Sequence, residues 1–202
     1  MNEPPFELEP DELPDPPDLP GEVIVKGSID EAIDALVDGL FASAEDAVDQ
    51  RGRFDLALPP QRALEPVWFR MMLATEYRLF PWAQTHVWLT DSDVTAAARL
   101  QETLIWPAGI PIEQVHPMPR CSPSEYQTRL EAALPGRPLD AVVLAADSRS
   151  QLDVSLGGMA SVFLNARRIA VLASVAACVG QDALSDEVRA AADQLHWCVA
   201  PA

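Results

Sequence analysis

The stretch LDAVVLA, residues 139–145, decides the fold class, because its side chains are apolar on both faces of an extended chain. A run of this kind is typical of an interior strand in a parallel sheet that helices cover on both sides. The runs FDLAL at 54–58 and IAVLA at 169–173 have the same character. Further strands are predicted at 22–26, 87–89 and 196–199, where the apolar runs are shorter.

Amphipathic segments separate the predicted strands. Apolar residues recur at helical spacing from Ile29 to Val48, with Ser28 as the N-cap before them and Gly52 as the exit after them. Other helices are predicted at 63–78, 95–105, 122–134 and 182–195. Strands that alternate with helices predict βαβ units, so the expected fold class is α/β, with a mainly parallel, doubly wound sheet and helices on both faces.

The composition excludes some classes of binding partner and predicts the cellular compartment. The chain of 202 residues has 31 acidic and 14 basic residues, which gives a formal charge of −17. Phosphate backbones and anionic lipids repel such a chain, so neither nucleic acid nor a membrane surface is an expected partner. No apolar run reaches the ~18–20 residues that span a bilayer, and the acidic N-terminus is unlike a secretory signal. Three scattered cysteines without a CxxC pair predict neither disulfides nor a metal site, and we therefore expect a cytoplasmic protein.

The first twenty residues, MNEPPFELEPDELPDPPDLP, differ from the rest of the chain. They hold seven prolines and seven carboxylates and no basic residue. Proline removes amide donors and like charges repel, so a disordered acidic tail over 1–20 is predicted ahead of a single α/β domain over 21–202. The tail is either a docking arm for a protein partner with a basic surface or a solubilising leader.

Candidate site residues are sought in the loops after the strands, because ligands of a doubly wound sheet bind beyond the carboxyl ends of its strands. Arg62, in the loop after 54–58, is either a phosphate-binding residue or an ordinary surface charge. Asp91 and Asp93, after 87–89, could perform acid–base chemistry or hold a cation, and the alternative is that they cap the next helix.

The remaining strand ends carry little recognisable chemistry. The loop after 139–145 runs from Asp147 to Gln151 and contains neither histidine nor cysteine. His86, His116 and His196 are far apart in the sequence and are not expected to gather. His86 would be the first of them to test, although it begins a strand and therefore points away from a site at the strand's end. No GxSxG, P-loop, HExxH or GxGxxG motif occurs.

Five passages, taken in order, resemble the 6-phosphogluconolactonases and, more distantly, the glucosamine-6-phosphate isomerases. They are PWAQTHVWLTDSD at 81–93, IPIEQVHPMP at 110–119, LDAVVLAA at 139–146, LNARRIAVLAS at 164–174 and LHWCVAPA at 195–202. The resemblance implies a doubly wound, Rossmann-like fold, a sugar phosphate of the pentose phosphate pathway as ligand, and no cofactor. It also makes Arg167, in the passage similar to the family's N-A-A-R-R, a candidate phosphate-binding residue.

The chain departs from this family in its ligand-facing loops. PPQRAL at 59–64 stands where the family has the glycine-rich phosphate loop S-G-G-S-T-P. Gln151 takes the place of the histidine in the family's G-M-G-x-D-G-H-T-A-S loop, which is thought to act as the general base. Asp91 matches the family aspartate, whereas Ser92 and Asp93 stand where glutamate and arginine are expected.

These departures lead to two expectations about function. The first is a divergent, shortened 6-phosphogluconolactonase-like protein that has lost lactone hydrolysis and acts as a binding or scaffolding protein. The alternative is an active hydrolase or isomerase on 6-phosphogluconolactone or a related sugar phosphate, with a rebuilt site. In that case Asp91, Asp93 and Gln151 are the candidate catalytic residues, and Arg62 and Arg167 are the candidates for binding phosphate.

Overall fold

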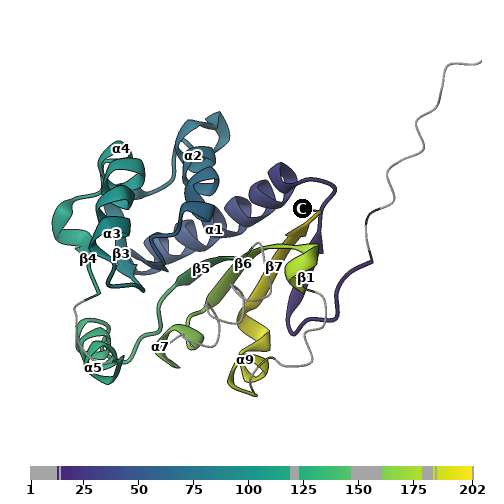
Figure 1. The fold of residues 1–202 in the computed structure, drawn as a ribbon. Coiled ribbons are helices and arrows are strands. Elements are labelled where there is room, and N and C mark those ends of the chain that lie inside the picture. Colours follow the sequence, from purple (N-terminus) through teal and green to yellow (C-terminus); the bar gives the residue numbers. More distant parts are fainter. Residues whose placement is uncertain are drawn as a thin grey trace, which may run out of the picture.

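The computed structural model describes residues 13, 15–118, 123–146, 161–178, 184 and 186–201. These residues form a seven-stranded, all-parallel sheet in the order β1-β7-β6-β5-β2-β3-β4 (Figure 1). The strands are β1 (Glu22–Val25), β2 (Phe54–Leu58), β3 (Thr85–Leu89), β4 (Val115–His116), β5 (Ala141–Ala146), β6 (Arg168–Ser174) and β7 (Leu195–Ala200). We call the edge where the strands begin the amino edge and the edge where they end the carboxyl edge.

Helices cover both faces of the sheet, as Figure 1 shows. One face carries α1 (Ile29–Arg51), α2 (Glu65–Leu73), α3 (Val94–Leu100) and α4 (Trp106–Ala108). The other carries α5 (Pro123–Ala133), α7 (Ser161–Leu164) and α9 (Asp186–Ala190), and a short helix α8 (Val175–Cys178) follows β6. Alternate residues of each central strand enter the two cores, so Leu56 packs against α1 while Ala57 lies in the opposite core.

The strand order confirms the predicted doubly wound α/β fold. From β2 the chain winds outward through β3 to β4, and then returns to the other side of β2 and winds through β5, β6 and β7. The winding direction therefore reverses between β2 and β5, which is where ligands of such sheets bind, at the carboxyl edge. The loop after β2 and the end of β5 flank this switch point.

The long helix α1 forms where the sequence predicted it. The Ser28 hydroxyl accepts a hydrogen bond from the Glu31 amide at 3.3 Å, and the Glu31 carboxylate accepts one from the Gly27 amide at 3.1 Å. These two bonds resemble a capping box, with the glutamate bonded to the amide before the N-cap residue, and they satisfy two amides around the start of the helix. Gly52 ends the helix with φ of 74°, a conformation that costs other residues steric strain.

Two predicted helices differ from the structure. The helix predicted at 63–78 is broken, because Ala74 is extended and only short 3₁₀ turns (Arg62–Leu64 and Thr75–Tyr77) flank α2. The helix predicted at 182–195 is described only as α9 and a 3₁₀ turn (Ala192–Gln194), and residues 182, 183 and 185 lie outside the described part. The helix predicted at 95–105 is present, but it widens into a π-helical turn over Gln101–Ile105 ahead of Pro107.

Buried charges tie the two halves of the sheet together at the amino edge. Asp140 and Asp55 are only 4% and 1% exposed. One Asp140 carboxylate oxygen accepts a hydrogen bond from the Asp55 amide at 2.9 Å, and the other is paired with the Arg51 guanidinium. Asp55 is paired with Arg53 and accepts a hydrogen bond from the Trp88 indole at 3.0 Å. Each buried carboxylate therefore has the partners that its burial requires.

The end of the acidic tail is attached to the sheet. Leu19 is 9% exposed and belongs to the core on the α5 side. The indole of Trp197, in β7, donates a hydrogen bond of 2.7 Å to the Pro20 carbonyl. The boundary predicted at residue 20 stays a prediction, because residues 1–12 and 14 lie outside the described part of the chain. Among the described helices, none is long and apolar enough to cross a membrane.

Candidate functional site

The loop after β2 presents proline where an anion would need backbone amides. Pro59 and Pro60 are buried and have no N–H groups. The Gln61 amide donates back to the Pro59 carbonyl at 2.7 Å, and the Gln61 carbonyl accepts from the Leu64 amide at 3.2 Å. A phosphate cradle needs several free amides that point at the ligand. In this loop neither proline can donate and the Gln61 amide is already bonded, while the exposed Arg62 side chain lies beside the switch point.

The two aspartates after β3 are both engaged with the backbone. An Asp93 carboxylate oxygen accepts hydrogen bonds from the amides of Thr95 at 2.8 Å and Ala96 at 3.2 Å, and so caps α3. The Asp91 carboxylate accepts from the Asp93 amide at 2.9 Å, which closes the turn before the cap. Both side chains are exposed. These contacts favour the structural alternative, and a catalytic part for either residue stays a prediction.

Of the remaining candidates, only the two arginines lie in the described part of the chain. Gln151 and the rest of the 147–151 loop lie outside the described residues. Arg167 lies just before β6, on the amino edge, and its Nε is 3.8 Å from the Asp140 carboxylate. Arg62 follows β2 on the carboxyl edge. The two predicted phosphate-binding arginines are therefore on opposite edges of the sheet and cannot hold one phosphate group.

Two of the histidines do gather, contrary to expectation. His86 Nδ1 lies 3.1 Å from His116 Nε2, and the His116 ring stacks on the Trp88 ring with centroids 3.8 Å apart. No strand was predicted around His116, but it is a member of the two-residue strand β4, which pairs with β3. Pairing between these strands brings together residues that are 30 positions apart. No local pattern signals this, so only the sheet register could have found the pair.

Burial sets the chemistry of this histidine pair. Desolvation lowers the pKa of His86, and the nearby Arg53 guanidinium lowers it further. Desolvation also lowers the pKa of His116, with His86 and Arg53 adding to the effect, whereas Asp55 opposes it at both rings. Both imidazoles are therefore held neutral, one donating to the other. Within the described residues, no group of three His, Cys, Asp or Glu side chains is placed to hold a metal ion.

Acid should weaken the fold through this pair. Because the pKa of both histidines is lower in the folded protein, the unfolded chain binds protons more readily. The contribution of the neutral pair to the free energy of unfolding is therefore fully present above the ordinary histidine pKa of 6.5 and is lost as pH falls below it. We expect the urea midpoint to fall between about pH 7 and pH 5, and to fall less in His116→Gln. Equal losses in the two proteins would contradict the role assigned to the pair.

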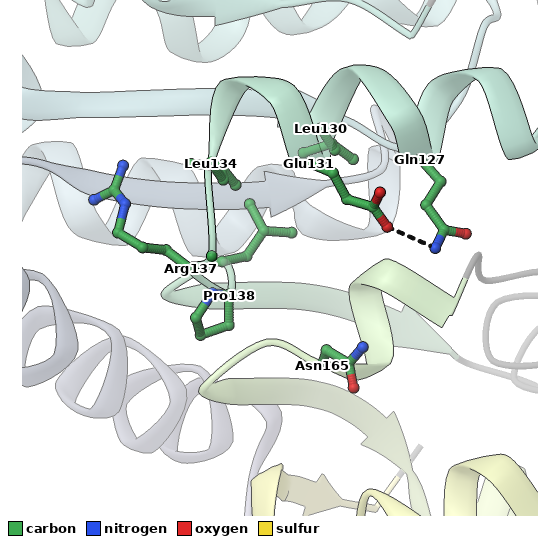
Figure 2. Close-up of a pocket in the computed structure, with 9 residues that line it drawn as sticks. Gln127, Leu130, Glu131, Leu134, Arg137, Pro138 and Asn165 are labelled. Atoms are coloured by element: carbon green, nitrogen blue, oxygen red, sulfur yellow. Dashed lines mark hydrogen bonds between the residues drawn. The ribbon is translucent and has the colours of Figure 1, made fainter.

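A pocket of about 300 Å³ lies between α5 and the segments that lead into β5 and β6. Figure 2 shows Gln127 and Glu131 side by side on α5, joined by a hydrogen bond of 2.9 Å, with Asn165 across from Gln127 and with Arg137 directed away from both. Leu130 and Leu134 form its apolar wall. The pocket contains none of the candidate site residues and lies on the amino edge, away from the switch point.

Comparison with known proteins shows that part of the sequence is similar to one kind of protein. No family model matches the chain. Over 103 residues, 48% of this chain, it is 37% identical to the human GDH/6PGL endoplasmic bifunctional protein, and over 97 residues it is 36% identical to the protein of the same name from Oryctolagus cuniculus. The matches span only 13% and 12% of the length of these relatives.

Solved structures extend the likeness to most of the chain. The 6-phosphogluconolactonase of Thermotoga maritima superimposes with a TM-score of 0.66 at 15% identity, covering 89% of this chain and 99% of its own. That of Leishmania guyanensis gives 0.66 at 14% identity, covering 91% and 97%. A monomeric glucosamine-6-phosphate deaminase gives 0.64 at 8% identity, covering 89% and 97%. The chain thus has the 6-phosphogluconolactonase fold, and its resemblance to the 6-phosphogluconolactonase and glucosamine-6-phosphate isomerase family is confirmed.

Proposed function

We propose that the protein is a 6-phosphogluconolactonase-like domain that no longer hydrolyses lactones and serves as a binding or scaffolding protein. The observation that carries this proposal is the loop after β2. At the switch point, where the fold binds its ligands, this loop holds two buried prolines, which have no amide donors, and a Gln61 amide that is already bonded to the Pro59 carbonyl. A sugar phosphate bound there would lack these three backbone donors for its most highly charged group.

Two further features support the proposal. The carboxylates of Asp91 and Asp93 already accept hydrogen bonds from the turn and from the start of α3. Both carboxylates thus already have a structural role in the turn and in the cap. In the sequence, Gln151 stands where the family has its histidine, and an amide is no general base at neutral pH.

The partner of such a scaffold would carry a basic surface. The chain has a formal charge of −17, and the tail contributes seven carboxylates to it without a basic residue. Complementary charge raises association rates and selects partners. We also propose a cytoplasmic location, which the buried free thiols of Cys178 and Cys198 support.

A lactonase assay tests the loss of activity. Freshly generated 6-phosphogluconolactone is supplied to the wild-type protein and to Asp91→Asn, Gln151→His and Arg62→Ala, and spontaneous hydrolysis is subtracted. We expect all four to remain at background, because restoring one histidine does not restore the phosphate loop. Turnover by the wild type that Asp91→Asn abolishes would overturn the proposal and establish the alternative, an active enzyme with a site rebuilt around β3.

A further inference from the structure

Arginines gather on the amino edge of this acidic protein. Arg51 and Arg53 precede β2, Arg137 precedes β5, and Arg167 and Arg168 lie where β6 begins. These are five of the 14 basic residues of the chain, gathered along three adjacent strands. The formal charge of the whole chain is −17, so an anion needs a local concentration of positive charge in order to bind. The amino edge provides one.

The charges of these arginines are not equally available. Arg51 and Arg53 are paired with the buried carboxylates of Asp140 and Asp55. Arg167 is half exposed, and its nearest carboxylate, 3.8 Å away, is that of Asp140, which Arg51 already neutralises. No carboxylate of the described residues is paired with Arg168, whose Nε is enclosed without a hydrogen-bond partner. Arg167 and Arg168 thus provide two adjacent guanidinium groups with unused donors.

Both side chains line one small cavity. The cavity has a volume of about 190 Å³ and lies between α1 and the start of β6. Its lining residues are Ser43, Asp46, Ala47, Gln50, Arg51, Asp140, Arg167, Arg168 and His196. Two of its acidic neighbours are already engaged, because Asp140 is bonded by Arg51 and the Asp55 amide, and Glu22 lies 2.6 Å from His196. Asp46, which is exposed, is the one acidic residue of the lining that has no ion pair among the described residues.

The helix α1 is shaped to admit the Arg168 guanidinium. A Cβ atom added to Gly39, in the middle of α1, would collide with Arg168 Nη2 and lie close to its Cζ. Glycine inside a helix costs about 1 kcal/mol relative to alanine, and the close approach of this guanidinium gives it a physical reason here. Burial lowers the pKa of Arg168, which means that its charge is poorly solvated. A bound anion would supply the missing solvation.

We propose that Arg167 and Arg168 form an anion site on the amino edge that takes one phosphate-type oxyanion, free or as a terminal monoester. Guanidinium groups present paired N–H donors that match phosphate oxygens. The volume is below the ~300–1,000 Å³ of sites that enclose whole small molecules, so the site recognises the anionic group rather than a complete sugar. It lies on the edge opposite the switch point and is independent of the proposed loss of catalysis.

Calorimetric titration tests the site with inorganic phosphate and, separately, with 6-phosphogluconate, at constant ionic strength. We expect saturable binding of both by the wild type, with the dissociation constant raised at least tenfold in Arg167→Ala and in Arg168→Lys. The lysine variant keeps the charge and removes the paired donors. Arg62→Ala, which removes an exposed arginine on the carboxyl edge, is the matched control and should bind both ligands as the wild type does.

Gly39→Ala separates a built site from general charge attraction. It removes no charge and favours the helix, but it displaces the Arg168 guanidinium. The dissociation constant for phosphate should therefore rise by a factor comparable to that in the two arginine variants. Urea unfolding and circular dichroism verify that each variant is folded. Absence of saturable binding by the wild type, or binding that none of these three variants weakens, would overturn the proposal. So would binding of 6-phosphogluconate that Arg62→Ala alone abolishes, because it would place the anion on the carboxyl edge.

Discussion

Replacing Asp140 by alanine is expected to lower the free energy of unfolding by about 3–5 kcal/mol, the usual cost of breaking a buried ion pair by removing one partner. The change leaves the Asp55 amide buried without an acceptor and the Arg51 guanidinium, whose side chain is 17% exposed, without its carboxylate. The loss falls at the centre of the sheet, where β2 and β5 share only two residue pairs. Urea unfolding followed by circular dichroism measures it.

Asparagine at the same position should behave differently. Its amide oxygen can still accept a hydrogen bond from the Asp55 amide, and it has no charge to desolvate. Burial raises the pKa of Asp140 above its ordinary value of 3.8, so the folded state binds this proton more tightly than the unfolded chain does. The free energy of unfolding therefore falls as pH rises from the ordinary pKa to the raised one. We expect Asp140→Asn to cost clearly less than Asp140→Ala, because the Asp55 amide keeps an acceptor, and to lack this fall. A loss as large as that of the alanine variant would show that the charge itself holds the two halves together.

Replacing Trp197 by alanine should cost about 3–5 kcal/mol of unfolding free energy. The side chain is fully buried in β7, between β1 and β6, and its indole holds the Pro20 carbonyl. Phenylalanine keeps most of the packing and loses the hydrogen bond, so Trp197→Phe should cost about 1 kcal/mol. The same variant should also release residues before Gly21, which limited proteolysis with mass spectrometry detects as faster cleavage there.

Trp106 provides the matched control, because it is 64% exposed on α4. Trp106→Ala should change the unfolding free energy by no more than about 0.5 kcal/mol and leave the cleavage of residues before Gly21 unchanged. If Trp197→Phe leaves that cleavage unchanged as well, the indole does not hold the tail end.

The sequence predicted the elements that depend on local chemistry. Phe54–Leu58 is the exact extent of β2, since Gly52 ends the helix before it and Pro59 prevents its continuation. The helix predicted at 63–78 failed because Ala74 takes an extended conformation that its own side chain does not require. Tertiary contacts hold the turn that follows, where Tyr77 donates a hydrogen bond to Asp38 of α1 at 2.7 Å. Contacts between distant segments override local propensity at such places.

The candidate site was predictable only in part. The proline loop at 59–60 and the capping position of Asp93 can be predicted from residue type alone. Arg62 was a candidate from its loop and Arg167 from its passage similar to N-A-A-R-R, and neither signal says on which edge of a sheet a residue lies. The contact between His86 and His116 depends on the register of β3 against β4, which is set by pairing in three dimensions.

The position of β1 has a consequence for how the protein is made. Its neighbour in the sheet is β7, Leu195–Ala200, which follows it in the sequence only after all the other described strands. During synthesis β1 leaves the ribosome long before β7 and cannot complete its place in this sheet until Leu195–Ala200 have followed. Until then the apolar side of β1 and the edge of β6 stay open to other nascent chains and to chaperones.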